Sequence, residues 1–379
     1  MNRQAFLDAL RGLAGALSEE ERARLIDYYA EMIDDRMEEG LSEDAAVADL
    51  GDPAELVRDL VSAQPAPSAS RQERSETVDA LRDVRIRVFD ADVAVIRAPL
   101  ANGAAAQLRF SDPGHYTWRM AGDALEISEN EGQRRGFFRL KQPTVTLTLS
   151  GRLPGALTFE GRGGDLRLDG VELGGDLAIT SSSGDINLSD VTCASEIGFS
   201  LRSGNLSMTR VAAHGALRAE ALSGDIEVLR LSVDDDAWLR TTSGDITLRE
   251  VRCGALTLAA TSGDIELDRG HALATSVHTS SGDVWLIELE SDPTLSVETA
   301  SGDIDLARSI AVETVLQTAS GDVDLRLSPL PCGYDIAADT RSGDIQLPRN
   351  NPPAQPGARQ PRIAIRTASG DIDARIAEA

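Results

Sequence analysis

Carboxylates recur at a regular spacing within a repeated Ser-Gly-Asp motif, and side chains of this type could take part in several kinds of chemistry. The aspartates of this motif are Asp185, Asp225, Asp245, Asp264, Asp283, Asp303, Asp322, Asp344 and Asp371. A row of carboxylates could bind divalent cations, transfer protons, or hydrogen-bond the backbone of a turn. The series has asparagine at position 205, which keeps an acceptor oxygen without the charge. A turn tolerates that exchange better than a metal site does. We therefore expect the aspartates to cap corners, with weak divalent-cation binding as the alternative.

The sequence gives little support to catalysis. A catalytic site needs a unique cluster in which an acid and a base lie in different environments. Here the carboxylates are repetitive, and the four histidines show no metal-ligand spacing. We found no nucleophile elbow, phosphate-binding loop or paired-cysteine motif. The sequence predicts a protein that is not an enzyme, with no catalytic, cofactor-binding or metal-binding residues. A carbohydrate-cleaving β-helix, the enzyme alternative, would need a groove with a non-repeating carboxylate pair.

The spacing of the motif predicts the fold. Its glycine recurs every 19 or 20 residues from Gly164 to Gly321, then after 22 and 27 residues. Apolar residues stand two and four positions after the glycine, with a polar residue between them, as in a half-buried strand. The glycine supplies the positive φ of a tight corner. The structural turn residues include Gly184, Gly224, Gly244, Gly263, Gly282 and Gly302, each with the aspartate that follows it.

These columns predict a mainly β chain whose body is a parallel β-solenoid, or β-helix, of about ten coils of 19–20 residues. Each coil is expected to hold one strand before the Ser-Gly-Asp turn and one after it. Threonines three positions before the glycine, such as Thr241 and Thr279, predict a ladder in which the hydroxyls bond to one another.

A small helical domain is predicted for residues 1–63. Apolar residues recur there at helical spacing, and Ser42, Gly51 and Asp52-Pro53 are typical helix boundaries, which indicates a small four-helix bundle. Residues 1–61 hold 16 Asp plus Glu and 6 Arg, a net charge of 6 − 16 = −10. The charge is either a solvated surface or a docking face for a basic partner.

A flexible linker is expected at 64–80, because residues 64–77 carry Pro, Ala, Ser and charge without an apolar period. The β domain then spans 81–379. Within it, residues 81–160 show a period of two and are expected to form antiparallel or edge strands that lead into the Ser-Gly-Asp coils of 161–379.

Composition narrows the class of protein further. The net charge of −25 argues against direct nucleic-acid binding. The N-terminus lacks the features of a signal peptide, and no apolar run of about 18 residues is present, so we expect a cytoplasmic protein without a membrane span. The three cysteines do not predict a disulfide framework.

Two stretches resemble known families. LSEEERARLIDYYAEMIDDRMEEGLSEDAAVADLGDPAELVRDLV resembles the HAAS family of small helical signalling domains, in its acidic helix, Tyr-Tyr pair, Glu-Gly turn and Leu-Gly-Asp-Pro. This resemblance implies association with a PadR-type transcription regulator. The body repeats Thr-x-Ser-Gly-Asp-Ile-x-Leu and resembles an adhesin-like family of β-strand repeat proteins, which implies a β-solenoid without assigned catalytic residues.

Together these features predict a signalling or scaffold protein. An acidic helical head would dock a protein partner, and a β-solenoid would serve as a rigid platform or sensor. The expected partner-binding residues are Tyr28, Tyr29, Asp34, Asp35, Glu38 and Trp285. An envelope-associated, adhesin-like structural protein is the alternative.

Overall fold

The computed structural model describes residues 2–15, 22–23, 25–26, 29–30, 33, 37, 42–57, 74–130, 143–309, 311–354 and 359–377. The chain forms two compact units. One contains residues 1–73, 111–115 and 130–143, and the other contains 74–110, 116–129 and 144–379. The first is called the head unit below and the second the solenoid.

The described part of the head is helical. Helix α1 spans Arg3–Leu13 and α3 spans Glu43–Leu50. The Asn2 side chain accepts a hydrogen bond from the Ala5 N–H and caps α1, while Asp52 accepts one from the Ala54 N–H at 2.9 Å and begins the next helical turn. Much of the stretch between α1 and α3 lies outside the described residues. The described elements therefore form a small helical unit and do not define the four-helix bundle that we expected. No helix in the described part of the chain has the length and apolar character that a bilayer span requires.

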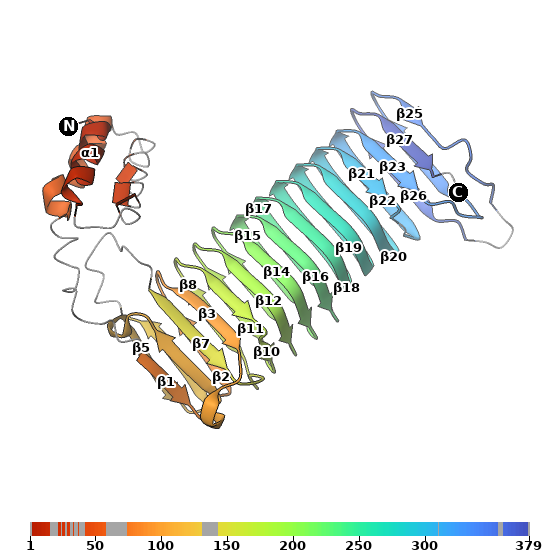
Figure 1. Cartoon of the computed structure of the whole chain (residues 1–379). Helices are drawn as coiled ribbons and strands as arrows, with labels where there is room; N and C mark the ends of the chain where they lie inside the picture. Colours follow the sequence, from red (N-terminus) through yellow and green to blue (C-terminus); the bar gives the residue numbers. More distant parts are fainter. Residues whose placement is uncertain are drawn as a thin grey trace. The chain divides into compact units, whose positions relative to one another are not determined.

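The described part of the solenoid contains 27 strands, which are stacked along its axis in Figure 1. The first ten are β1 Arg74–Val78, β2 Asp83–Arg87, β3 Asp92–Arg97, β4 Ala106–Phe110, β5 Tyr116–Ala121, β6 Ala124–Glu129, β7 Thr144–Leu149, β8 Leu157–Gly161, β9 Leu166–Asp169 and β10 Glu172–Leu173. The next ten are β11 Leu177–Ser181, β12 Ile186–Cys193, β13 Ile197–Leu201, β14 Leu206–Ala213, β15 Leu217–Ser223, β16 Ile226–Val233, β17 Ala237–Ser243, β18 Ile246–Ser262, β19 Ile265–Ser281 and β20 Val284–Ser301. The last seven are β21 Ile304–Ala307, β22 Glu313–Ser320, β23 Val323–Leu327, β24 Asp335–Thr340, β25 Ile345–Gln346, β26 Arg362–Thr367 and β27 Ile372–Ile376. Two 3-10 turns, Ala101–Gly103 and Pro113–His115, complete the described elements.

Each regular coil contains three strand segments rather than the two that we expected. In the coil of β12 and β13, the segments are residues 186–189, 191–193 and 197–201. Asp190 separates the first two, because its φ of +54° turns the chain and interrupts the inward and outward alternation. Inward side chains from all three segments, such as Ile186, Val191 and Phe199, are buried in one continuous core. The second corner was missed because it contains no glycine.

The coils stack in parallel and in register. Ile186 pairs with Leu206, Leu206 with Ile226, and Ile226 with Ile246, so side chains of one kind form columns along the axis. The prediction of a mainly β solenoid is confirmed. The predicted number of coils is wrong: about eight regular turns run from Gly164 to Gly321.

The stacking order is reversed at both ends of the solenoid. β2 and β3 pair with β8 and β9 on one side and with β6 and β7 on the other, so the coil that comes second in the chain is the outermost of the parallel coils at this end. At the C-terminal end, β26 and β27 lie between the β22–β23 coil and the β24–β25 coil. The last coil in the sequence is therefore the penultimate coil in space.

The N-terminal strands only partly match the expected antiparallel arrangement. β2, β3, β6 and β7 are parallel members of the stack, whereas β1, β4 and β5 are antiparallel. β1 lies within the range expected to be linker, where Val78 is buried against the core and pairs with Ala106. That one apolar residue was too weak a signal among the charged residues around it.

The glycine corners allow neighbouring coils to approach closely. Gly244 has a φ of +143°, and a Cβ added there would lie 2.2 Å from the carbonyl oxygen of Gly224. The same contact recurs along the stack, at 2.2 Å for Gly224 and 1.9 Å for Gly263. Two independent reasons thus require glycine at this corner. Its φ is strained for other residues, and a Cβ would collide with the backbone of the neighbouring coil.

We predict that Gly244→Ala lowers the free energy of unfolding by about 3 kcal/mol, because the methyl group collides with backbone that cannot move independently. Gly198→Ala is the matched control, since a Cβ at Gly198 meets nothing within 4 Å. That variant should differ from wild type by less than about 0.5 kcal/mol. Denaturant unfolding followed by circular dichroism compares the two, and equal losses would contradict the close-approach explanation.

Candidate functional site

The Ser-Gly-Asp aspartates form one row along a corner of the solenoid. In each step, the Oδ1 atom of one coil accepts a hydrogen bond from the backbone N–H of the equivalent residue in the next coil. Asp225 Oδ1 accepts from the Asp245 N–H at 2.9 Å, and Asp245 Oδ1 accepts from the Asp264 N–H at 2.8 Å. Among the described residues the row runs through Asp92, Asp165, Asp185, Asn205, Asp225, Asp245, Asp264, Asp283, Asp303, Asp322, Asp371 and Asp344.

Asn205 fits this row without disturbing it. Its N–H donates to Asp185 Oδ1 and its own Oδ1 accepts from the Asp225 N–H, both at 2.9 Å. The row therefore uses an acceptor oxygen at each position and does not require a charge. Stacked carboxylates about 4.8 Å apart repel by roughly 1 kcal/mol in water. A hydrogen bond to an ionised acceptor contributes about 1.5–3 kcal/mol and offsets that repulsion.

Threonines support the same corner from within. Thr241 Oγ1 donates to the Gly224 carbonyl at 3.1 Å, and Thr318 Oγ1 donates to the Gly302 carbonyl at 3.2 Å. The expected threonine ladder is present, since Thr279 pairs with Thr299 and Thr299 with Thr318. The expected partner of the hydroxyls is wrong, because they donate to the glycine carbonyl of the preceding coil and not to one another.

The row has the geometry of a structural corner rather than of a reactive centre. Each aspartate has the same kind of partner, so the row lacks the contrast in environment that an acid and base pair needs. The described residues contain no group of three or more His, Cys, Asp or Glu side chains placed to hold a metal ion. Asp185 and Asn205 border a shallow hollow of about 230 Å³ with Asn187, Ser207 and Glu227, which offers no distinctive donor set.

A second polar row, which we did not predict, lies at the non-glycine corner. Seven residues there have φ between +52° and +63°, and all are charged. They are Asp190, Arg210, Arg230, Glu250, Arg269, Glu288 and Arg308, and we call them the charged ladder. Each stands six residues after a repeat glycine, so this spacing could have revealed the ladder in the sequence. A left-handed conformation costs about 1–2 kcal/mol for such residues, and the corner needs it to turn the chain.

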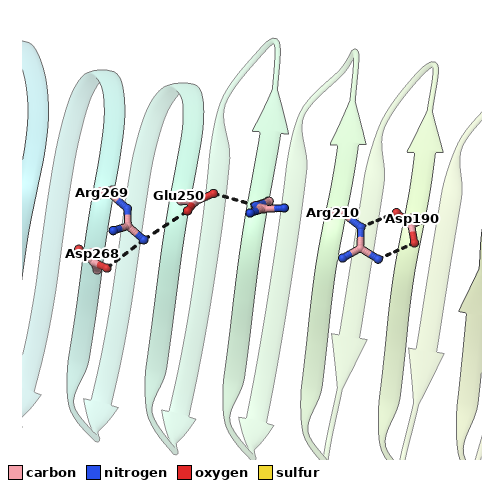
Figure 2. Close-up of polar contacts among 6 residues, drawn as sticks. Asp190, Arg210, Glu250, Asp268 and Arg269 are labelled. Carbon is pink, nitrogen blue, oxygen red and sulfur yellow. Dashed lines mark hydrogen bonds and ion pairs between the residues drawn. The ribbon is translucent and has the colours of Figure 1, made fainter.

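Ion pairs join several neighbouring members of the charged ladder, as Figure 2 shows for Asp190 with Arg210 and for Glu250 with Arg269. Arg210 binds Asp190 in a bidentate manner, with Nε to Oδ1 at 2.5 Å and Nη2 to Oδ2 at 2.6 Å. Glu250 contacts Arg230 at 2.9 Å and Arg269 at 3.2 Å, from the coils on its two sides. All these side chains are at least partly exposed, so each pair contributes little to stability. Each pair joins equivalent positions of neighbouring coils.

The ion pairs also perturb acid–base equilibria. The hydrogen bonds from Arg210 hold the pKa of Asp190 below its ordinary value, and Asp190 raises the pKa of Arg210. Hydrogen bonding to Arg230, reinforced by Arg269, lowers the pKa of Glu250. Both carboxylates therefore stay ionised to lower pH than free side chains do.

The expected contact residue Trp285 lies partly exposed in an outward column, between Glu266 and Asp305 of the neighbouring coils. Burial raises the pKa of Asp305, although Arg326 opposes the shift from 3.3 Å. Trp238, which the sequence suggested is a corner or surface residue, has Arg218 at 4.1 Å from its ring centre, a cation–π contact between stacked coils.

The predicted partner residues of the head are mostly outside the described part of the chain. Tyr28, Asp34, Asp35 and Glu38 all lie there. Tyr29 is described, but it is buried and packs edge-to-face on Phe6, with ring centres 5.9 Å apart. Tyr29 is therefore a core residue, which corrects its expected place on the partner surface. A helical tyrosine can face either side, and the Tyr-Tyr pair did not show which one is buried.

The cysteines have no thiol chemistry that points to function. Cys193, Cys253 and Cys332 are free. Burial raises the pKa of Cys253 to about 12, which keeps its thiol protonated and weakly nucleophilic.

We predict that Arg210→Gln raises the pKa of Asp190 toward its ordinary value of about 3.9. Because the folded pKa of Asp190 is lowered, the ion pair stabilises the fold above about pH 4, and this contribution is lost as the pH falls through the folded pKa. Carboxyl-carbon NMR titration measures the pKa directly. Arg252→Gln, a change of the same type on another outward side chain, should leave Asp190 unaffected. An unchanged Asp190 in Arg210→Gln would show that Arg210 is not the cause.

Comparison with solved structures finds similar chains at low identity. A protein described as a "putative adhesin" from Bacteroides fragilis has 12% identity, with 82% of this chain and 99% of that chain covered and a TM-score of 0.32. A "putative lipid binding protein" from Parabacteroides distasonis has 13% identity, 79% and 96% coverage and a TM-score of 0.38. A "putative cell adhesion protein" from Clostridium sporogenes has 11% identity, 81% and 99% coverage and a TM-score of 0.17. With such low TM-scores, none of them bears on the function of this chain. No curated protein matches it.

Family models match both parts of the sequence. The HAAS model matches residues 5–59, and the Toastrack DUF4097 model matches residues 147–238 and 231–375. The second match covers more than half of the chain and includes the Ser-Gly-Asp corners, the aspartate row from Asp165 onward and the charged ladder. Both resemblances read from the sequence are thus confirmed. The chain carries an N-terminal HAAS domain and belongs to the Toastrack DUF4097 family.

Proposed function

We propose that this protein is a non-enzymatic signalling scaffold that works in the cytoplasm. The HAAS domain docks a protein partner, a PadR-type transcription regulator, and the solenoid acts as a rigid platform or sensor. The observation that carries the proposal is the fusion of a HAAS domain to a body whose repeated carboxylates are engaged in its own backbone hydrogen bonds.

The described surface of the head is suited to a basic partner. Its apolar side chains, including Phe6, Leu10 and Val47, are directed into the core between α1 and α3. The outward side chains include several exposed carboxylates, namely Asp8, Glu43, Asp44, Asp49, Asp52 and Glu55. An acidic surface speeds encounter with a basic partner and selects against acidic ones.

The solenoid is suited to a rigid role. Long parallel strands bind their neighbours through backbone hydrogen bonds, and successive coils meet at the glycine corner and in the core. Ion pairs of the charged ladder join some of the coils as well. The surface presents repeated outward columns rather than one deep cleft among the described residues. Such a body can hold ligands or domains at fixed spacing, as other repeat proteins do.

The proposal predicts that the head is needed for partner binding. Affinity purification from native cells with mass spectrometry should recover a transcription regulator with the full chain and lose it with a chain that starts at residue 64. In the full chain, Asp44→Lys with Asp49→Lys should weaken regulator binding by at least about 10-fold, because both reverse charge on the exposed side of α3.

Two controls make this result specific. Glu227→Lys with Glu266→Lys reverses the same amount of charge on the solenoid and should leave regulator binding unchanged. Circular dichroism should show that each chain keeps its β signal. A regulator held equally by both chain lengths would refute docking through the head. Envelope components held by both would move the function to the solenoid and favour the adhesin-like alternative.

A further inference from the structure

The C-terminal end of the solenoid exposes apolar side chains that are buried in every other coil. Ile345 and Leu347 stand at the inward positions of the outermost coil, yet they are 42% and 44% exposed. Their equivalents in the coil beneath, Ile372 and Ala374, are 0% and 2% exposed. We expected both residues to be buried. They are exposed because the reversed stacking order leaves no coil to cover them.

The backbone of this end is also unpaired. β24 pairs with β26 and β25 pairs with β27, and neither strand has a partner on its outer side in the described part of the chain. The aspartate row ends here as well. The Asp344 N–H donates to Asp371, but no further coil among the described residues donates to the Asp344 carboxylate. An exposed parallel edge with apolar side chains is a template for pairing with another strand.

The N-terminal end of the solenoid is closed in comparison. Antiparallel β5 covers β6, and antiparallel β4 covers β7 and is itself paired with β1. Leu108, Phe110 and Tyr116 of these strands are buried, and the two rings stack with their centres 5.4 Å apart. Among the described residues, only the C-terminal end of the solenoid therefore offers a coil without a covering strand.

We propose that the β24–β25 end is a self-association surface, on which the same end of a second copy of this chain packs to form a head-to-head dimer. This inference is independent of the proposed function. The outer side of the β24–β25 coil has the same kind of strand edge and apolar side chains as the contacts between coils within the chain. Another coil of the same composition is therefore its best complement. Head-to-tail stacking would require an open N-terminal end, and that end is covered. The contact is therefore isologous and closes at two subunits.

Charge at the edge is compatible with this pairing. Asp339 and the neighbouring Arg341 are both exposed at the end of β24. Because these two side chains carry opposite charges, a symmetric contact between two β24 edges does not bring charge of a single sign together. Ile345 and Leu347 then lose their contact with water and pack against apolar side chains of the other subunit.

Sedimentation velocity of the full chain from about 1 to 100 µM tests the proposal, with wild type expected to form a dimer in this range. Ile345→Asp with Leu347→Asp should weaken the dimer by at least about 100-fold, because two carboxylates would be buried without partners. Both side chains are exposed in the single chain, so the variant should keep its fold, as circular dichroism can verify. Leu222→Asp with Leu273→Asp places the same charges on two other exposed leucines, 52% and 61% exposed, and should dimerise like wild type.

Three results would overturn the proposal. Wild type could stay monomeric through the whole concentration range, which would show that the end is left open or is covered within one chain. The Ile345 and Leu347 variant could dimerise as wild type does, which would place the contact elsewhere. Wild type could form open-ended assemblies larger than a dimer, which would exclude a closed head-to-head contact.

Discussion

The solenoid depends on a close approach of backbone at the glycine corner. There, the carbonyl oxygen of one glycine lies about where the Cβ of the next would stand, so coils can stack only where neither has a side chain. The strands on either side keep their regular spacing because the corner does not hold them apart. The aligned glycines also expose their carbonyls to the threonine hydroxyls of the following coil. One steric requirement thus sets the period, the register and the polar contacts of the corner.

The aspartate row follows from the same constraint. A corner that turns sharply leaves backbone N–H groups without strand partners, and such groups are costly if unpaired. The carboxylate of one coil accepts a hydrogen bond from the backbone N–H of the next coil. The N–H group that the turn leaves without a strand partner is thereby satisfied, and the bond links the two coils. Asn205 shows that the acceptor oxygen is the conserved element of this link within the chain. The charged ladder lies at the corner that has no glycine. Charged residues in a left-handed conformation stand there, and their charges alternate in sign over much of the stack.

Much of this architecture could be predicted from the sequence. The period of 19 or 20 residues and the paired apolar columns predicted a parallel solenoid, because both apolar columns alternate with polar residues as in strands and recur once per coil. The quoted motifs of both parts predicted their families. The order of the last two coils could not be predicted, since the motifs at Gly343 and Gly370 are alike and their spacing shows an insertion without showing where it stacks.

The unpredicted parts of the candidate site have distinct physical causes. The charged ladder was not predicted because glycine was taken as the sequence signal of a corner. The corner that holds the ladder uses Asp, Glu and Arg at positive φ instead. Tyr29 was placed on the surface because the helical period does not show which of two adjacent tyrosines faces the core. The exposure of Ile345 and Leu347 depends on stacking order, which is a property of the whole fold and not of the local sequence.

The most direct test of the corner measures unfolding of Asp245→Asn and Asp245→Ala with a chelator and with millimolar calcium or magnesium. If Asp245 serves as the acceptor for the Asp264 N–H, Asn should match wild type, Ala should lose about 1–2 kcal/mol, and no protein should respond to the cations. A cation that binds the folded state would raise its stability in a saturable way. Equal damage from Asn and Ala, together with cation-dependent stability of wild type, would contradict the structural role and show that the row is a metal site.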